Sequence, residues 1–126
     1  MSEDSSPFQN LSPNPFFRGV VDVSPLEVNQ WKDKVTLIDV RQPDEYTGEL
    51  GHIPNSKLVP LGVFPQHLGE FTGEKTVVLV CRSGNRSAQA AAFAKENGIS
   101  KVVNMAGGMM AWNEHGLEVS REESRN

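Results

Sequence analysis

The only cysteine of this chain, Cys81, stands between a β-rich run and an alanine-rich run. Residues 76–80 (TVVLV) predict a buried strand, and residues 88–95 (AQAAAFAK) predict a helix. A helix begins with free N–H groups and the positive end of its dipole, which favour a bound anion. Arg82 and Arg86 add positive charge, and these features together favour the nucleophilic thiolate. The stretch therefore predicts a reactive thiolate in an anion-binding loop.

Composition and charge limit the kinds of partner. A content of 37% hydrophobic and 22% charged residues is typical of a globular protein, and 126 residues suffice for one domain with its own core. The formal net charge of −4 argues against nucleic acid or an anionic membrane as the main partner. The two arginines beside the cysteine are therefore a local positive charge on an acidic chain, which indicates that this loop attracts an anion.

The cysteine count and the N-terminus bear on the compartment. One cysteine excludes an intramolecular disulfide and fits a reducing environment. The first residues (MSEDSS) lack the basic start and apolar core of a secretory signal, so we expect a cytoplasmic protein. No apolar run approaches the ~18 residues of a membrane span. Three scattered histidines and one cysteine show no metal-ligand spacing, so no metal and no other cofactor is expected.

The chain is predicted to consist of an N-terminal arm (1–15), one domain (16–119) and a polar tail (120–126) that frays. The arm holds three prolines and four serines, which resist regular structure. We expect it to be flexible, with Phe16 and Phe17 docking on the core. The alternative is an arm that covers a neighbouring groove or subunit.

Five β-rich runs alternate with helical patterns. The runs are residues 20–23, 35–40, 57–59, 76–81 and 101–105, and the helical patterns fall at 24–32, 43–46, 65–71, 88–97 and 109–116. Pro65 predicts a helix start or a kink in the third helical pattern. The alternation indicates an α/β fold, with helices on both faces of a parallel sheet and right-handed crossovers. Ligands in such sheets bind beyond the carboxyl ends of strands, where Cys81 stands.

Three motifs stand in order along the chain. They are residues 37–41, 45–46 and 51–54 (LIDVR, EY, GHIP), residues 80–87 (VCRSGNRS) and residues 107–112 (GGMMAW). Together they resemble the single-domain rhodaneses, a family of persulfide-forming sulfurtransferases, over roughly residues 18–119. The resemblance implies a five-stranded parallel sheet in the order 1-5-4-2-3, with the active site in the loop after the fourth strand. Asn55 and Ser56 stand where the family usually has Gly-Ala, and asparagine tolerates the left-handed backbone that glycine would supply.

The resemblance implies a two-step reaction. The Cys81 thiolate would take sulfur from thiosulfate or a similar donor, and cyanide in vitro or a small or protein thiol in vivo would then remove it. Backbone N–H groups of the loop would stabilise the persulfide; the loop residues are Arg82, Ser83, Gly84, Asn85 and Arg86. Both arginines are expected to attract the dianionic donor. Relatives that prefer mercaptopyruvate tend to carry small uncharged residues at the position of Arg82, which favours thiosulfate-like donors here.

Three further residues are expected to support the loop. Ser87 would cap the following helix or hydrogen-bond to the loop. Asp39 would orient neighbouring loops through a hydrogen bond or ion pair with Arg41, and a catalytic Asp39 is the alternative. Glu45 and His52 match the family's structural motif and are interpreted as residues that brace a turn.

The spacing of the arginine separates sulfur from phosphate chemistry. Arg86 follows Cys81 by five places, whereas cysteine phosphatases, including relatives on this fold, place an arginine six places after the cysteine, where this chain has Ser87. The shorter loop suits the single outer atom of a persulfide, so a phosphatase or arsenate reductase is the weaker alternative. A non-catalytic or relay-type binding module that delivers sulfur to one protein partner is another. The choice between monomer and homodimer stays open.

Overall fold

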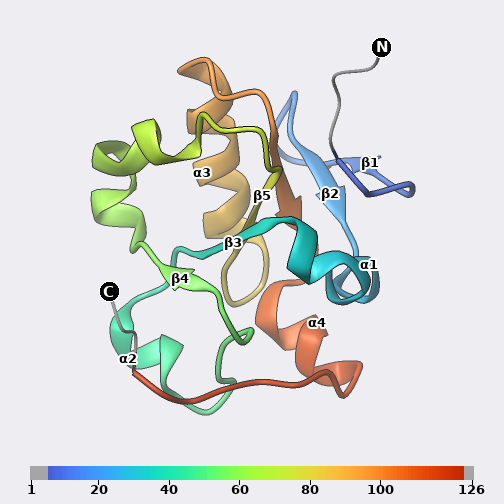
Figure 1. Ribbon diagram of the computed structural model, residues 1–126, viewed down its shortest axis with the longest axis vertical. Coiled ribbons are helices and arrows are strands. Elements are labelled where there is room, and N and C mark those ends of the chain that lie inside the picture. The colour runs from blue at the N-terminus through green and yellow to red at the C-terminus, as the bar shows by residue number, and fades with distance from the viewer. Residues whose placement is uncertain (1–5, 124–126) are drawn as a thin grey trace.

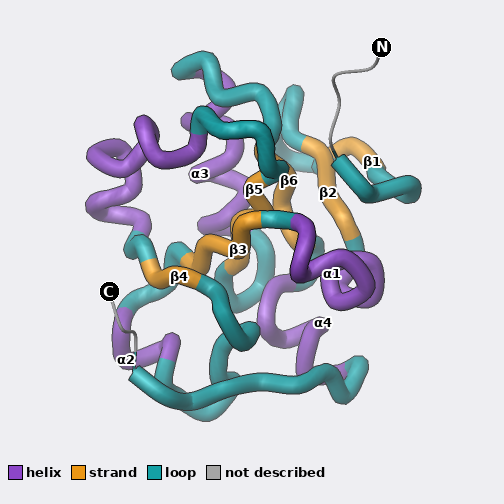
Figure 2. The backbone as a smooth tube through the Cα atoms, in the orientation of Figure 1, coloured by secondary structure: helices purple, strands orange, loops and turns teal. Residues whose placement is uncertain are grey.

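Six strands form one sheet in the computed structural model, which describes residues 6–123 (Figure 1). The strands are β1 (Ser12–Pro13), β2 (Val21–Val23), β3 (Thr36–Asp39), β4 (Lys57–Leu58), β5 (Val77–Val80) and β6 (Val102–Met105). The α-helices are α1 (Pro25–Trp31), α2 (Pro43–Tyr46), α3 (Asn85–Glu96) and α4 (Gly108–Glu114). Two 3-10 segments, η1 (Lys32–Lys34) and η2 (Leu61–Phe71), complete the chain, so that strands and helices alternate after β2 (Figure 2). None of these helices is long and apolar enough to cross a membrane.

The strand order is β1-β2-β6-β5-β3-β4, and every pair is parallel except β1 with β2. The five parallel strands follow the predicted order 1-5-4-2-3, so the predicted α/β architecture is confirmed. The predicted number of strands is one too few, because β1 adds an antiparallel strand at the edge. Since β5, β3 and β6 run parallel side by side, their carboxyl ends meet at one edge of the sheet, directly before Cys81.

The two faces of the sheet bury separate apolar clusters, as strands covered on both faces require. Val77 and Leu79 of β5 pack in the cluster that includes α3 and η2. Val78 and Val80 alternate with them and join the opposite cluster, which includes Trp112 of α4 and a residue of α1. Helices therefore cover both faces, as predicted.

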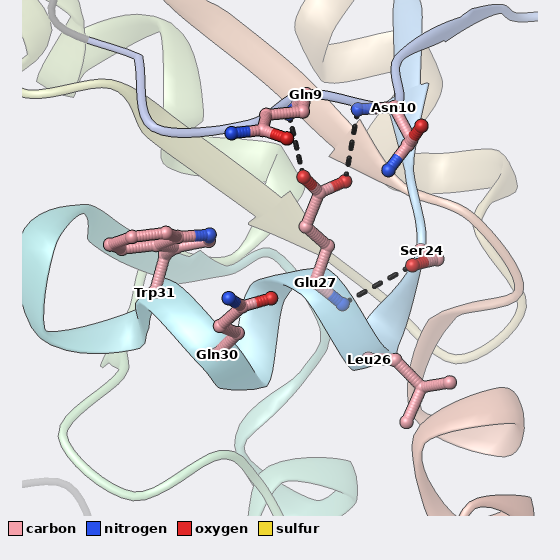
Figure 3. A pocket seen from close by; sticks show the side chains of 7 residues that line it. All are labelled: Gln9, Asn10, Ser24, Leu26, Glu27, Gln30 and Trp31. Atoms are coloured by element: carbon pink, nitrogen blue, oxygen red, sulfur yellow. Dashed lines mark hydrogen bonds between the residues drawn. The ribbon is translucent and has the colours of Figure 1, made fainter.

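The arm is packed against its own chain over the residues described. Phe8 is only 8% exposed and belongs to the cluster on the α1 and α4 face. The Glu27 carboxylate of α1 accepts the backbone N–H groups of Gln9 (2.6 Å) and Asn10 (3.2 Å), as Figure 3 shows. The expectation that the arm resists regular structure is wrong for these residues, because β1 pairs with β2 and the segment packs through a buried aromatic ring and a carboxylate on α1. Its flexibility stays a prediction.

Phe17 packs against the core, but Phe16 is 80% exposed, so the prediction that both dock is wrong for Phe16. The Asn14 side chain accepts the N–H groups of both phenylalanines (2.8 and 2.9 Å), a local turn that leaves the Phe16 ring in solvent. In the polar tail, Ser120 and His52 exchange two backbone bonds of 2.8 Å. The remaining predicted parts of the arm and tail, residues 1–5 and 124–126, lie outside the described residues.

The segment η2 differs from its prediction. It is a continuous 3-10 helix from Leu61 and runs through Pro65, instead of an α-helix that starts there. Proline lacks the N–H that an α-helix would use, and two buried rings, Phe64 and Phe71, stack with centroids 5.4 Å apart. Packing of these rings on the core thus favours a continuous 3-10 helix over an α-helix that begins at Pro65.

The turn after α2 is braced by stacked rings. The rings of Tyr46 and His52 are parallel with centroids 3.6 Å apart, and His52 Nδ1 donates to the Tyr46 carbonyl (2.7 Å). Asn55 has a φ of 72°, the left-handed conformation predicted for it. The predicted brace by His52 is confirmed, and burial raises the pKa of Tyr46.

Replacement of Phe8 tests the packing of the arm. We expect Phe8→Ala to lower the free energy of unfolding by about 3 kcal/mol, because it removes a buried ring. Phe16→Ala is the matched control and should change it by less than about 0.5 kcal/mol. Denaturant unfolding of both variants measures this difference, and equal small effects would show that the arm does not pack in solution.

Candidate active site

Cys81 is the first residue after β5, and its side chain lies at the start of a tight loop that leads into α3. The residue is 1% exposed, and the Gly84 N–H donates to its sulfur (3.1 Å). Gly84 caps α3 in the left-handed conformation, with a φ of 101° that disfavours other residues. The first helical bond runs from Ala88 N to Gly84 O (3.2 Å), so the amides of residues 85–87 have no helical acceptor of their own. The strand, loop and helix predicted around Cys81 are all present.

The loop's carbonyl groups are held by α4. Met109 N donates to the Cys81 carbonyl (2.8 Å), and Met110 N donates to the Arg82 carbonyl (3.0 Å). Gly108, with a φ of 58°, lies so close that a Cβ there would overlap the carbonyl of Cys81. Because both carbonyl groups are directed to α4, the loop can present N–H groups to the sulfur, as at Gly84.

Ser87 is the only side chain that hydrogen-bonds the sulfur in the described structure, with Oγ 3.3 Å from Sγ. Gly84 holds the capping position of α3, so the prediction that Ser87 caps the helix is wrong, and its alternative, a bond to the loop, is observed. The same hydroxyl donates to Oδ1 of Asn104, and Asn104 Nδ2 donates to Asp22 (2.9 Å). Sequence reasoning missed Asn104 and Asp22, although a single polar side chain within the apolar run of β6 was a visible signal.

The guanidinium of Arg86 has a partner that the sequence did not reveal. It forms two hydrogen bonds with the Glu45 carboxylate, of 2.8 and 2.9 Å. The hydrogen bond from Arg86 outweighs burial and lowers the pKa of Glu45 to about 2, and the same bond raises the pKa of Arg86. Glu45 also accepts the N–H of Gln42 (3.0 Å), which completes a capping box of α2. Glu45 therefore braces its turn, as predicted, and also neutralises Arg86.

Asp39 and Arg41 form a buried ion pair, and the contact predicted between them is present. Arg41 Nε and Nη2 donate to the two carboxylate oxygens (2.9 and 2.8 Å), and Nη2 also donates to the Gly51 carbonyl (2.7 Å). These bonds join the end of β3 to the turn after α2. Asp39 lies within electrostatic reach of Arg86, whose pKa it helps to raise.

The predicted loop residues and Ser87 divide into three groups. Gly84 and Ser87 contact the sulfur, Arg86 is paired with Glu45, and Arg82, Ser83 and Asn85 are exposed. Arg82 is thus the exposed cation beside the site. Within residues 6–123, no three His, Cys, Asp or Glu side chains lie close enough to hold a metal ion.

Comparison with known proteins agrees with this arrangement. Residues 22–115 match the family model of the rhodanese-like domain. A sulfurtransferase of Allochromatium vinosum is 37% identical over 91 residues, which cover 72% of this chain and 83% of that protein. The chain belongs to the rhodanese-like domain family, and relatives within that family are named sulfurtransferases.

Two further comparisons place the domain in context. A probable adenylyltransferase/sulfurtransferase of Mycobacterium tuberculosis is 37% identical over 95 residues, but these cover 71% of this chain and only 24% of that protein. The crystal structure of a rhodanese-related protein from Thermoplasma volcanium superposes with a TM-score of 0.73 at 29% identity, covering 80% of this chain and 98% of that one. The fold thus occurs both as a short chain and within a longer one.

The Glu45–Arg86 pair predicts an acid-sensitive stability. Because the pKa of Glu45 falls from 4.5 to about 2 on folding, its contribution is complete above pH 4.5 and is lost as the pH falls toward 2. We expect Glu45→Gln to lower the free energy of unfolding at pH 7 by about 1 kcal/mol, after allowance for the partial exposure of both side chains. Unfolding of the variant and the wild type at pH 7 and at pH 2 measures the difference, which should shrink at the lower pH.

Asp44→Asn is the control, because it removes the same charge from an exposed carboxylate of the same helix. Its effect should be smaller at pH 7. An equal effect of the two substitutions would attribute the loss to charge on α2 and not to the pair with Arg86.

Proposed function

We propose that this protein is a thiosulfate sulfurtransferase that carries sulfane sulfur as a Cys81 persulfide. The proposal rests on the surroundings of the Cys81 sulfur. The Gly84 N–H donates to this sulfur, and α3 begins directly after Gly84. Such an arrangement of N–H groups stabilises negative charge on a bound atom. Membership of a family with sulfurtransferase relatives supports the same chemistry.

The first half-reaction is a displacement at sulfur. The Cys81 thiolate attacks the outer sulfur of thiosulfate, a new S–S bond forms, and the S–S bond of thiosulfate breaks. Sulfite leaves with the electron pair of that bond. The loop N–H groups stabilise the negative charge on the resulting persulfide, and Arg82 attracts the dianionic donor to the rim.

The second half-reaction returns the thiolate. A nucleophile attacks the outer sulfur of the persulfide, the Cys81 S–S bond breaks, and its electron pair stays on Cys81. Cyanide yields thiocyanate in this step, and a thiolate yields a new persulfide. Cys81 is only 1% exposed, but the acceptor attacks the outer sulfur of the persulfide and not Sγ itself. That outer sulfur lies about 2 Å beyond Sγ, which brings it within easier reach of the acceptor.

The loop's size favours this chemistry over phosphate transfer. Arg86 stands five places after Cys81, and its guanidinium is bound by the Glu45 carboxylate. It is therefore not free to bind a phosphate group in the loop. A phosphate would need donors for several oxygens, whereas the terminal sulfur is a single atom. The phosphatase and arsenate reductase alternatives are therefore disfavoured.

The proposed partners are a small anionic sulfur donor and a small or protein thiol as acceptor. Relay to one protein partner is the second candidate, since the relative from M. tuberculosis combines adenylyltransferase and sulfurtransferase in its name and is much longer than this chain. A thiol that must stay reduced between turnovers fits the cytoplasm.

Mass measurement of the protein tests the first half-reaction. After incubation of the reduced protein with thiosulfate, we expect a gain of one sulfur atom, because the persulfide is stable until an acceptor is added. Cys81→Ser should gain nothing. Cyanide should then remove the added sulfur as thiocyanate. Absence of the gain, together with turnover of an aryl phosphate, would refute the proposal.

Substitution of Arg82 tests how the donor is attracted. We expect Arg82→Ala to lower kcat/KM for thiosulfate about tenfold, with a much smaller loss for an uncharged organic hydropersulfide (RSSH), which gives up its outer sulfur as RS⁻ leaves, because only the dianion feels the exposed charge. Arg18→Ala is the matched control, since Arg18 precedes β2 and lies at the opposite edge of the parallel sheet. Steady-state rates at low salt measure the effect. Equal losses for both donors would contradict the charge argument.

A further inference from the structure

A chain of hydrogen bonds leads from the active sulfur across the sheet to β2. Cys81 Sγ contacts Ser87 Oγ (3.3 Å), Ser87 Oγ contacts Asn104 Oδ1, and Asn104 Nδ2 contacts Asp22 Oδ1 (2.9 Å). Ser87 and Asn104 are 0% and 1% exposed, so water does not compete for their bonds. Asp22 and Asn104 are partners in the register of β2 and β6, which aligns their side chains. The chain is therefore built into the sheet.

The chemistry of the donors and acceptors gives this chain a direction. The Asp22 carboxylate only accepts, so Asn104 must present its NH₂ group to Asp22 and its carbonyl oxygen to Ser87. The Ser87 hydroxyl lies within donor distance of both Cys81 Sγ and this oxygen, but it carries only one proton. Because the Asn104 oxygen only accepts and its contact is much the shorter of the two, the proton is given to Asn104. Cys81 then faces the lone pairs of Ser87. The thiol can donate to them, but a thiolate receives no hydrogen bond from Ser87.

We propose that Asp22 is a positioning residue that acts through Asn104 to keep the Ser87 proton away from the Cys81 sulfur. A hydrogen bond to a thiolate stabilises it and lowers its nucleophilicity. By withholding one such bond, Asp22 leaves the thiolate with its N–H donor at Gly84 and with a higher intrinsic nucleophilicity. The inference deepens the proposed function, since it rests on Cys81 as the nucleophile.

The other charged groups near the sulfur are held apart from this chain. The guanidinium of Arg86 interacts with Cys81 but is paired with Glu45, and Asp39 is paired with Arg41. Arg82 is exposed at the rim. On the far side of Asp22, Asn14 Nδ2 donates to the same carboxylate oxygen (3.0 Å). Substitution of Asn14 therefore removes a bond to Asp22 and leaves the chain toward Ser87 intact.

The test is alkylation of Cys81 by iodoacetamide as a function of pH, without any sulfur donor. In Asp22→Ala the Asn104 amide is free to turn, and the Ser87 proton becomes available to the thiolate. We expect the midpoint of the profile to fall by about one pH unit, the effect of one hydrogen bond. The limiting rate at high pH should fall about threefold, because nucleophilicity falls with basicity.

Matched variants separate this role from a structural one. Adding Ser87→Ala to Asp22→Ala should abolish the shift, so the two substitutions are coupled. Asp22→Asn should keep the wild-type midpoint, since its amide oxygen still accepts from Asn104, and so should Asn14→Ala. If Asp22→Ala does not fold, Asn104→Ala serves in its place, with the same shift and the same reversal by Ser87→Ala.

An unchanged midpoint in the folded variant, or a shift that persists without Ser87, would overturn the inference. Either result is independent of the proposed function, because alkylation involves no sulfur donor and no sulfur acceptor. Conversely, a failure of the wild-type protein to gain sulfur from thiosulfate would leave the alkylation result intact.

Discussion

The carbonyl groups of Cys81 and Arg82 accept hydrogen bonds from the first amides of α4, and the orientation of the active loop depends on these bonds. Parallel pairing of β5 with β6 places the carboxyl ends of both strands together, so the helices that follow them start at the same point. The beginning of α4 holds the carbonyl groups, while the amides before α3 are left for the sulfur. Gly108 is required because any side chain there would overlap the loop.

This division of hydrogen bonds also sets the charge of the site. Arg86 is neutralised by Glu45, so the exposed charge beside the sulfur comes from Arg82. In the proposed reaction the donor and the departing sulfite are both dianions. A site with two uncompensated arginines would attract the donor more strongly but would also retain the product. One exposed cation, with the neutral Gly84 N–H at the sulfur, suits a reaction in which one anion must leave before the acceptor arrives.

Much of this arrangement could be predicted from local patterns. The run before Cys81 and the alanines after it predicted a strand and a helix, and the three motifs implied the order of the five parallel strands. The partner of Arg86 could not be read, because Glu45 is 41 positions away and no local pattern pairs them. The contacts of the arm could not be predicted, since its prolines and serines indicate only a lack of regular structure, whereas the burial of Phe8 and the arm's bonds to the Glu27 carboxylate depend on tertiary structure. Pro65 likewise predicted a helix start, but packing of Phe64 and Phe71 extends η2 through it.

Asn104 shows why a polar residue in a buried strand is informative. Its neighbours in β6 are Val103 and Met105, and an apolar residue would suit the same strand without the need for partners. A buried amide without hydrogen bonds costs about 1–3 kcal/mol of stability. A buried asparagine therefore needs an acceptor for its NH₂ group and a donor for its oxygen. Asp22 supplies an acceptor on one side and Ser87 a donor on the other. Since the same carboxylate is bound by Asn14, the ordering of the N-terminal segment and the hydrogen bonding of the active sulfur share one acidic group.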